Sequence, residues 1–182
     1  MEDFALDTKH GDYLAFLGRI TPDKGVDIAI EVARRVGMKL KMAAKVDKVD
    51  RQYFEQVVRP QLRDPLVEHI REIDQITKRD FLGGAYALVF PIGWPEPFGL
   101  AMIEAMACGT PVVAMDRGSV PEIIVHGKTG FICNSVDGIV RALGNVQSID
   151  RKDCRRHVER HFSVRAMVDA YEAAYRKVLA RH

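Results

Sequence analysis

The sequence lacks a long apolar run and an apolar leader. Its longest stretch without a charged residue, Phe81–Pro95, holds 15 residues and two prolines, whereas a membrane-spanning helix needs about 20 apolar residues. The first twelve residues, MEDFALDTKHGD, are charged and mostly acidic, which is not the pattern of a secretory signal peptide. We therefore expect a cytoplasmic protein without a membrane anchor.

The sequence also has little net charge. Its 27 Lys and Arg residues against 25 Asp and Glu residues give +2 at pH 7, so there is no broad basic field of the kind that binds nucleic acid. The charge is unevenly placed, because residues 151–182 carry nine basic and four acidic residues and residues 1–150 carry a net −3. The basic tail is either a solvated helix face or a surface for an acidic partner or membrane head groups.

Cysteine is scarce, and no two cysteines form a CxxC pair. The three thiols favour a reducing compartment in which they serve as small, inert apolar residues. Cys154, His157 and His161 share roughly one face of an expected helix, but three ligands without an HExxH motif do not define a zinc site. We expect a basic helix surface there and no metal, and we expect His126 to be a turn residue. The cysteines are Cys108, Cys133 and Cys154.

The pattern of apolar residues is typical of one folded α/β domain. The chain has 182 residues, 47% of them hydrophobic, which is enough to bury a core. Short apolar runs alternate with helical patterns, and this predicts a Rossmann-like, doubly wound parallel sheet with helices on both faces. Thr21 is the expected N-cap of the first helix, with Pro22 at its first position. About six strands are expected, over residues 13–17, 39–44, 67–73, 87–91, 112–115 and 131–133. The main helices are expected over residues 22–36, 50–62, 77–84, 99–108, 136–145, 150–161 and 164–180.

The first expected strand leads into the segment Gly18–Gly25, GRITPDKG. Its two cations, Arg19 and Lys24, flank the N-terminus of the next helix, and free N–H groups at a helix N-terminus attract anions. The segment is not a Walker A loop, because the order GxxxxGK[ST] is absent. It predicts an anion site, with exposed surface charges as the alternative.

The fourth expected strand leads into the proline-rich loop Pro91–Gly99 and then a helix. Glu96 in the loop and Glu104 in the helix can face one crevice, where carboxylates accept hydrogen bonds from sugar and ribose hydroxyls. The backbone amides of Phe98, Gly99 and Leu100 are orphan donors at the start of that helix. The alternative for Glu104 is an ordinary place on a helix surface.

These segments together resemble the C-terminal, donor-binding domain of retaining GT-B glycosyltransferases of family four, the group 1 type. Glu96 and Glu104 match the family's E-x7-E signature, and residues 18–25 match its G-R-x4-K-G element. Residues 118–122 and 127–131 match two downstream segments, so the resemblance covers residues 12–180. It implies the C-terminal half of a GT-B fold. Residues 1–11 would then be the remnant of a linker, and the helix over 164–180 would cross to a missing N-terminal domain.

The resemblance also implies roles for individual residues. Arg19 and Lys24 would hold the donor diphosphate, Glu96 would contact hydroxyls of the donor sugar, and Glu104 would hold the ribose. Ile73 and Lys78 would flank the nucleobase. The substrate would be a UDP-, GDP- or ADP-sugar whose hexose is transferred with retention and without a metal cofactor. The implied catalytic residues are Arg19, Lys24 and Glu96, and the implied donor-binding residues are Gly18, Arg19, Lys24, Ile73, Lys78, Glu96, Phe98, Gly99, Leu100 and Glu104.

Two positions depart from the pattern of the family. Many relatives end the second strand in Gly-x-Gly, where this chain has Ala44 followed by Lys45. Lys45 is either an extra phosphate contact or a solvated lysine. Many relatives also place a glycine near the end of the third strand, where this chain has Arg71, whose side chain could crowd the base site.

The resemblance covers one domain of a two-domain enzyme. We expect the chain to be an excised donor domain that binds nucleotide but transfers no sugar alone, because orientation and exclusion of water need both domains. The alternatives are a non-catalytic nucleotide-sugar-binding module and the donor subunit of a split transferase. The last helix would dock on its own domain, stay mobile or pair with another copy as a weak homodimer. Peripheral membrane contact of the full enzyme is also left open.

Overall fold

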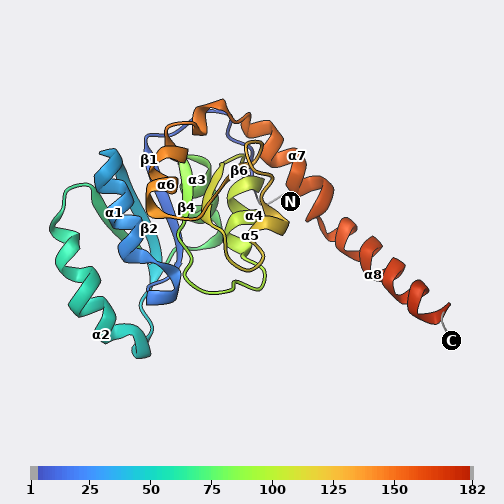
Figure 1. Ribbon diagram of the computed structural model, residues 1–182, viewed down its shortest axis with the longest axis horizontal. Helices are drawn as coiled ribbons and strands as arrows, with labels where there is room; N and C mark the ends of the chain where they lie inside the picture. Colours follow the sequence, from blue (N-terminus) through green and yellow to red (C-terminus); the bar gives the residue numbers. More distant parts are fainter. Residues whose placement is uncertain (1–3, 181–182) are drawn as a thin grey trace.

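The computed structural model describes residues 4–180 and has a six-stranded sheet at its centre (Figure 1). Neighbouring strands are all parallel, in the order β3-β2-β1-β4-β5-β6. Each of the six expected strands is present, so the predicted Rossmann-like α/β fold is confirmed. The strands are β1 (Tyr13–Arg19), β2 (Lys39–Lys45), β3 (Val67–Arg71), β4 (Ala87–Phe90), β5 (Val112–Met115) and β6 (Gly130–Cys133). The helices are α1 (Val26–Val36), α2 (Arg51–Tyr53), α3 (Gln75–Gly83), α4 (Leu100–Ala107), α5 (Val120–Ile123), α6 (Val136–Leu143), α7 (Arg151–His161) and α8 (Val164–Leu179).

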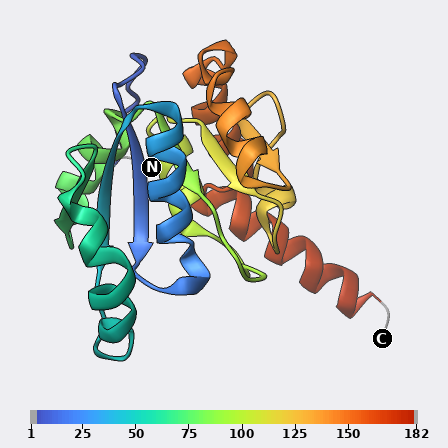
Figure 2. The same ribbon diagram turned by 60° about the vertical axis from the view of Figure 1, so that its left-hand side comes forward.

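Both faces of the sheet are covered by helices, as Figures 1 and 2 show. Alternate residues of β1 point to opposite faces, so Leu14 and Phe16 pack against α1 and α6, while Tyr13 and Ala15 belong to the cluster formed with α3, α4 and α7. All four side chains are buried. A strand that is apolar on both faces is what a central parallel strand requires.

The first helix begins later than the sequence predicts. Residues Pro22–Lys24 form a short 3₁₀ turn, and α1 starts only at Val26. Gly25 separates the two with a φ of 67°, because the chain turns there against Pro91, whose carbonyl oxygen would lie 2.2 Å from a Cβ atom on residue 25. Thr21 and Pro22 take the N-cap and the first position of this turn, as expected, but of the turn and not of α1. The Thr21 side chain makes no capping bond, and its hydroxyl is buried without a partner within residues 4–180.

Two other elements differ from the expectation. The predicted helix over residues 50–62 is irregular: α2 continues into a π-helical stretch, Phe54–Val58, and a 3₁₀ stretch, Arg59–Arg63. Pro60 lies in the second stretch and has no N–H to donate, so regular α-helical bonding cannot continue through it. The third strand ends at Arg71 instead of Ile73, after an irregularity in its pairing with β2.

The two ends of the described chain behave differently. The segment from Phe4 lies against the domain, where the Asp7 amide donates to the Cys108 carbonyl at 3.0 Å; the first three residues of the expected linker lie outside the described residues. Helix α8 instead projects away from the body (Figure 1), and none of its residues is buried. The sequence analysis left three possibilities for this helix, and the structure contradicts the first of them, docking on its own domain.

No helix between residues 4 and 180 has both the length and the apolar character that crossing a membrane requires.

The order of the strands fixes where a ligand would bind. The chain winds outward through β2 and β3 on one side of β1 and through β5 and β6 on the other side of β4. The strand order therefore reverses between β1 and β4, and ligands of doubly wound folds bind in the crevice outside the carboxyl ends of the strands at such a point. The two segments singled out in the sequence follow these two strands.

Candidate functional site

The loops after β1 and β4 are joined to each other. The Gly93 amide donates to the Asp23 carbonyl at 2.8 Å, and Gly25 lies against Pro91 so closely that no side chain fits at residue 25. The glycine is required both for this contact and for its left-handed φ. The first predicted segment and the second are thus held together at one end of the sheet.

A hollow of about 300 Å³ lies between these loops. Six residues that the sequence places in the donor site line it, and Gly18 leaves space in it, because a Cβ atom there would meet nothing within 4 Å. A ligand can therefore approach the backbone at the end of β1. The lining residues are Leu17, Gly18, Lys24, Phe90, Glu96, Phe98, Gly99, Leu100 and Ala101.

Lys24 and Glu96 form an ion pair at this hollow. Lys24 Nζ lies 2.5 Å from Glu96 Oε2, and the two side chains are 20% and 11% exposed. The indole N–H of Trp94 donates to the same oxygen at 3.1 Å. The hollow therefore holds a fixed cation and a fixed carboxylate side by side, which suits a ligand with both phosphate and hydroxyl groups.

The backbone of Glu96 is held by the loop that precedes α5. The Ser119 amide donates to the Glu96 carbonyl at 2.8 Å. Gly118 has a φ of 54°, and a Cβ atom there would lie 2.3 Å from the same carbonyl oxygen. Close approach to Glu96 is thus the physical reason for a glycine at position 118, one of the positions in the downstream segment of residues 118–122.

The N-terminus of α4 opens beside the ion pair. Gly99 precedes the helix with a φ of 75° and accepts the Met102 amide at 3.0 Å. The amides of Phe98, Gly99 and Leu100, which lie at or just before the first residue of the helix and are called the α4 amides below, donate to no group in the described part of the chain. Free amides at a helix N-terminus carry partial positive charge and bind anions.

The remaining predicted residues lie outside the hollow. Lys78 Nζ and Glu104 Oε1 are 2.8 Å apart, both side chains 20% exposed, so α3 and α4 are bridged by a second ion pair. Ile73 is partly buried and packs against the apolar cluster on that face. The structure thus brings Lys78 to Glu104 and Lys24 to Glu96, as two separate pairs.

Arg19 is the predicted residue that points elsewhere. Its side chain is 56% exposed, and Nη1 lies 3.4 Å from Asp47 Oδ2. Lys45 also pairs with Asp47, at 3.2 Å. The hydrogen bond from Lys45, and then that from Arg19, holds the pKa of the Asp47 carboxyl below its usual range. The sequence analysis did not predict that Asp47 would pair with these cations. It also did not predict that Trp94 would contact Glu96. The available signal for Trp94 was its position two residues before Glu96, between Pro91 and Pro95.

Arg71, one of the two departures noted above, has a left-handed backbone conformation. Its φ is 62°, and it is the single non-glycine residue with a positive φ within residues 4–180. This left-handed region is one that glycine enters freely and other residues enter at a cost. The turn that the chain makes here therefore favours glycine, and Arg71 occupies it at a cost.

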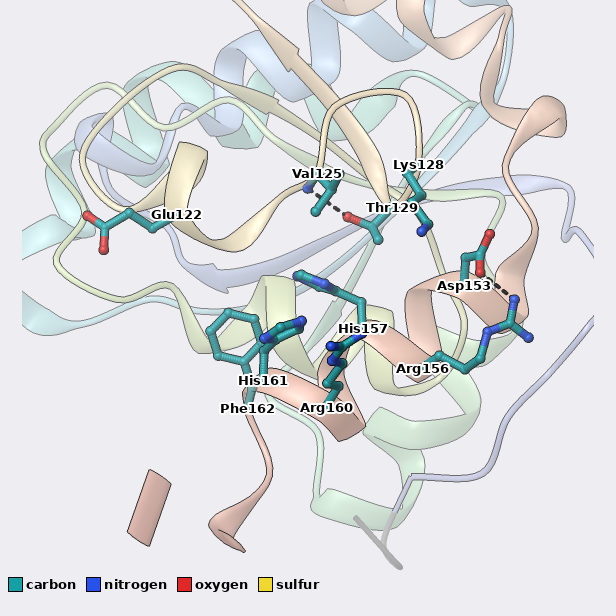
Figure 3. Close-up of a pocket in the computed structure, with 10 residues that line it drawn as sticks. All are labelled: Glu122, Val125, Lys128, Thr129, Asp153, Arg156, His157, Arg160, His161 and Phe162. Carbon is teal, nitrogen blue, oxygen red and sulfur yellow. Dashed lines mark hydrogen bonds and ion pairs between the residues drawn. The ribbon is translucent and has the colours of Figure 1, made fainter. Parts of the chain in front are cut away.

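A second hollow, of about 610 Å³, lies between α7 and the loop after α5 (Figure 3). Of the three residues considered as metal ligands, His157 and His161 line it with ring centres 4.9 Å apart, and Cys154 does not line it. His157 Nε2 lies 2.9 Å from the Ile123 carbonyl oxygen, and burial lowers the pKa of this imidazole. Cys154 is buried, with its thiol against the Thr129 carbonyl. Burial raises the pKa of that thiol to about 12. Exposed basic side chains, Lys128 and Arg160 among them, border the hollow. No group of three or more His, Cys, Asp or Glu side chains within residues 4–180 is arranged to hold a metal ion.

The fold and the site define the chain as a Rossmann-like α/β domain of the GT-B type, with a crevice at its switch point that holds a cation, a carboxylate and unpaired backbone amides. The chain belongs to the group 1 glycosyltransferases, because the family model described as "Glycosyl transferases group 1" matches residues 4–159. The family resemblance read from the motifs is thereby confirmed.

Relatives of known name and solved structures agree with this assignment. The chain is 30% identical to the D-inositol 3-phosphate glycosyltransferase of Mycolicibacterium gilvum over 193 aligned positions, which cover 93% of this chain and 40% of that protein. The glycosyltransferase AviGT4 of avilamycin A biosynthesis superposes with a TM-score of 0.80 at 26% identity, over 100% of this chain and 56% of that one. HepE of Anabaena, solved with UDP and glucose, superposes with a TM-score of 0.79 at 18% identity, over 91% of this chain and 49% of that one. The chain thus spans well under two thirds of each of these proteins.

Proposed function

We propose that this chain binds the nucleotide-sugar donor of a glycosyltransferase. The observation that carries the proposal is the Lys24–Glu96 pair, which lies with the free amides of α4 in the hollow at the switch point. A cation beside unpaired backbone donors fits a diphosphate, and a carboxylate next to them fits a sugar hydroxyl. The complex of HepE with UDP and glucose supports this ligand class for the fold.

In this proposal each predicted residue meets one part of the donor. The diphosphate lies against Lys24 and the amides of Phe98–Leu100, and Arg19 leaves Asp47 to reach it. Glu96 accepts from a hydroxyl of the hexose. Glu104 accepts from the ribose at the site now taken by Lys78, with Ile73 and Lys78 beside the base. UDP-, GDP- and ADP-sugars all carry these groups, so the base is left to experiment.

The proposed reaction is retaining transfer of a hexose. The bond between the anomeric carbon and the diphosphate oxygen breaks, and its electron pair stays on the diphosphate. The acceptor hydroxyl forms a new bond to the anomeric carbon and passes its proton to an oxygen of the departing diphosphate. Charge develops on the leaving group, where fixed cations and amides lower the energy of the transition state. We propose that Lys24, Arg19 and the α4 amides supply this stabilisation without a divalent metal.

We further propose that the acceptor is bound by an N-terminal domain outside this chain. Two observations support this. The chain spans only 40–56% of the relatives described above, and α8 exposes a stripe of apolar side chains to solvent. A binding module without catalysis and the donor subunit of a split transferase remain the alternatives. The exposed apolar residues of α8 are Val164, Met167, Val168, Tyr171, Tyr175, Val178 and Leu179.

Calorimetric titration with UDP, GDP and ADP tests the proposal. We expect one nucleotide to bind, and we expect Lys24→Ala and Glu104→Ala each to weaken it at least tenfold. Lys128→Ala is the matched control, because it removes a lysine at the second hollow, and it should bind like the wild type. Equal binding in all four proteins would refute the site. Sugar transfer to an acceptor by the 182-residue chain alone would refute the need for a second domain.

A further inference from the structure

The side chain of Trp94 contacts both members of the ion pair in the hollow. Its Nε1–H donates to Glu96 Oε2 at 3.1 Å, and Lys24 Nζ lies 5.5 Å from the centre of its ring. A cation at this distance from the face of an indole is attracted to it. The three side chains therefore form one cluster, in which Lys24 and Trp94 donate to the same carboxylate oxygen.

The local sequence explains this arrangement. Trp94 precedes Pro95, and Glu96 precedes Pro97. A residue before a proline is restricted to extended conformations, and proline fixes its own φ. The two prolines thus restrict the backbone on both sides of Glu96 and fix the path of the loop. In this path the indole N–H of Trp94 reaches the Glu96 carboxylate.

The cluster leaves one carboxylate oxygen for a ligand. Both donors use Glu96 Oε2, and Oε1 accepts no hydrogen bond from any described residue. Glu96 is 9% exposed, and the residue lines the hollow. A carboxylate whose rotamer is fixed by two donors presents its second oxygen in one direction, which lowers the entropy lost on binding.

We propose that Trp94 is a positioning residue that makes the site selective for a nucleotide carrying a sugar over the bare nucleotide. The inference rests on the proposed function, in which Glu96 accepts from the sugar. Trp94 holds the Glu96 carboxylate and the Lys24 ammonium in fixed positions relative to each other. Glu96 Oε1 is then free to accept a hydrogen bond from a sugar hydroxyl. The diphosphate contacts of the α4 amides do not depend on the indole. A direct stacking contact between Trp94 and the base is the competing explanation.

The test compares Trp94→Phe with the wild type in two calorimetric titrations, one with a nucleotide and one with the corresponding nucleotide sugar (below, its sugar ester). The three pairs of probes are UDP and UDP-glucose, GDP and GDP-mannose, and ADP and ADP-glucose. Phenylalanine keeps an aromatic face for Lys24 and removes the N–H. We expect affinity for the nucleotide to stay within twofold and affinity for the sugar ester to fall about tenfold. Circular dichroism checks that the variant is folded, as the 39% exposure of Trp94 leads us to expect.

Tyr53→Phe is the matched control, because it removes a hydroxyl that donates to Asp27 Oδ1, also at 3.1 Å, away from the hollow. It should leave both affinities unchanged. Trp94 is the chain's only tryptophan, so its emission in the wild type should change more with the sugar ester than with the nucleotide.

Three outcomes would overturn the inference. Unchanged affinity of Trp94→Phe for both ligands would show that the indole does not position Glu96. Equal losses for both ligands would assign Trp94 to the base or to the structure of the loop. Failure of the wild type to bind any of the six probes would overturn the proposed function and this inference together, and that result is distinct from the first two because it appears before any substitution.

Discussion

Lys24 Nζ and Glu96 Oε2 lie 2.5 Å apart although the residues are 72 positions apart in the chain. The contact exists because β1 and β4 are neighbours in the sheet, so that their following loops meet at the switch point. The pair is mostly shielded from water. Removing one partner of such an ion pair lowers the stability of the fold more than removing both, because the remaining charge is then buried without an opposite charge beside it.

A double-mutant cycle measures this coupling. We expect Lys24→Met and Glu96→Gln each to lower the free energy of unfolding by about 1–2 kcal/mol, less than for a fully buried pair because the site is partly exposed. The double variant should lose less than the sum of the two. Urea denaturation followed by circular dichroism gives all four values. Strictly additive losses would show that the two side chains do not interact in solution.

A buried arginine at the opposite end of the sheet is expected to matter more for stability. Arg151 is 2% exposed, and burial lowers the pKa of its guanidinium. It donates to the carbonyls of Asp7, Gly83 and Ala85 and to the Thr110 hydroxyl at 2.6–2.8 Å. These bonds join α7 to the segment that follows Phe4 and to the end of α3.

Arg151→Met should therefore destabilise the fold by about 3 kcal/mol or more, because buried carbonyls lose their donors. Arg156→Met on the same helix removes an exposed guanidinium paired with Asp153, and its cost should stay below about 1 kcal/mol. Chemical denaturation of both variants under identical conditions makes the comparison. Similar midpoints for the two would mean that the Arg151 network contributes little.

The backbone of Arg71 allows a test of strain. Arg71→Gly and Arg71→Ala both remove the guanidinium, but only glycine enters the left-handed region without cost. We expect the glycine variant to be more stable than the alanine variant by about 1 kcal/mol. Thermal unfolding measures the difference. An alanine variant as stable as the glycine variant would mean that the φ of 62° is not maintained in solution.

The sequence predicts the fold well because the apolar runs of β1, β4 and β5 are short, buried on both faces and separated by helical patterns. It predicts that Lys24, Glu96 and the α4 amides share a crevice because their segments follow strands whose carboxyl ends meet. It could not predict the start of α1 at Val26, since the left-handed turn at Gly25 depends on contact with Pro91, 66 positions further along.

Side-chain partners were harder to predict than positions. Arg19 pairs with Asp47, and Lys78 pairs with Glu104. The first pair depends on the path of the loop after β2, and the second on how α3 packs against α4; no local sequence pattern specifies either. Arg151 looks like a surface residue of a basic helix in the sequence, and only the packing of α7 against the start of the chain buries it. The roles of these residues toward a donor stay predictions.

The central claim is that nucleotide binds at the carboxyl ends of β1 and β4, in the hollow of Lys24 and Glu96. The most direct measurement is a titration of the ¹⁵N-labelled chain with the nucleotide that binds, observed by amide NMR spectra. We predict that the amide signals of Gly18, Phe98, Gly99 and Leu100 shift together and saturate, while that of Lys128 at the second hollow stays in place. Shifts confined to the surroundings of Lys128 and Arg160, with Phe98–Leu100 unmoved, would contradict the account.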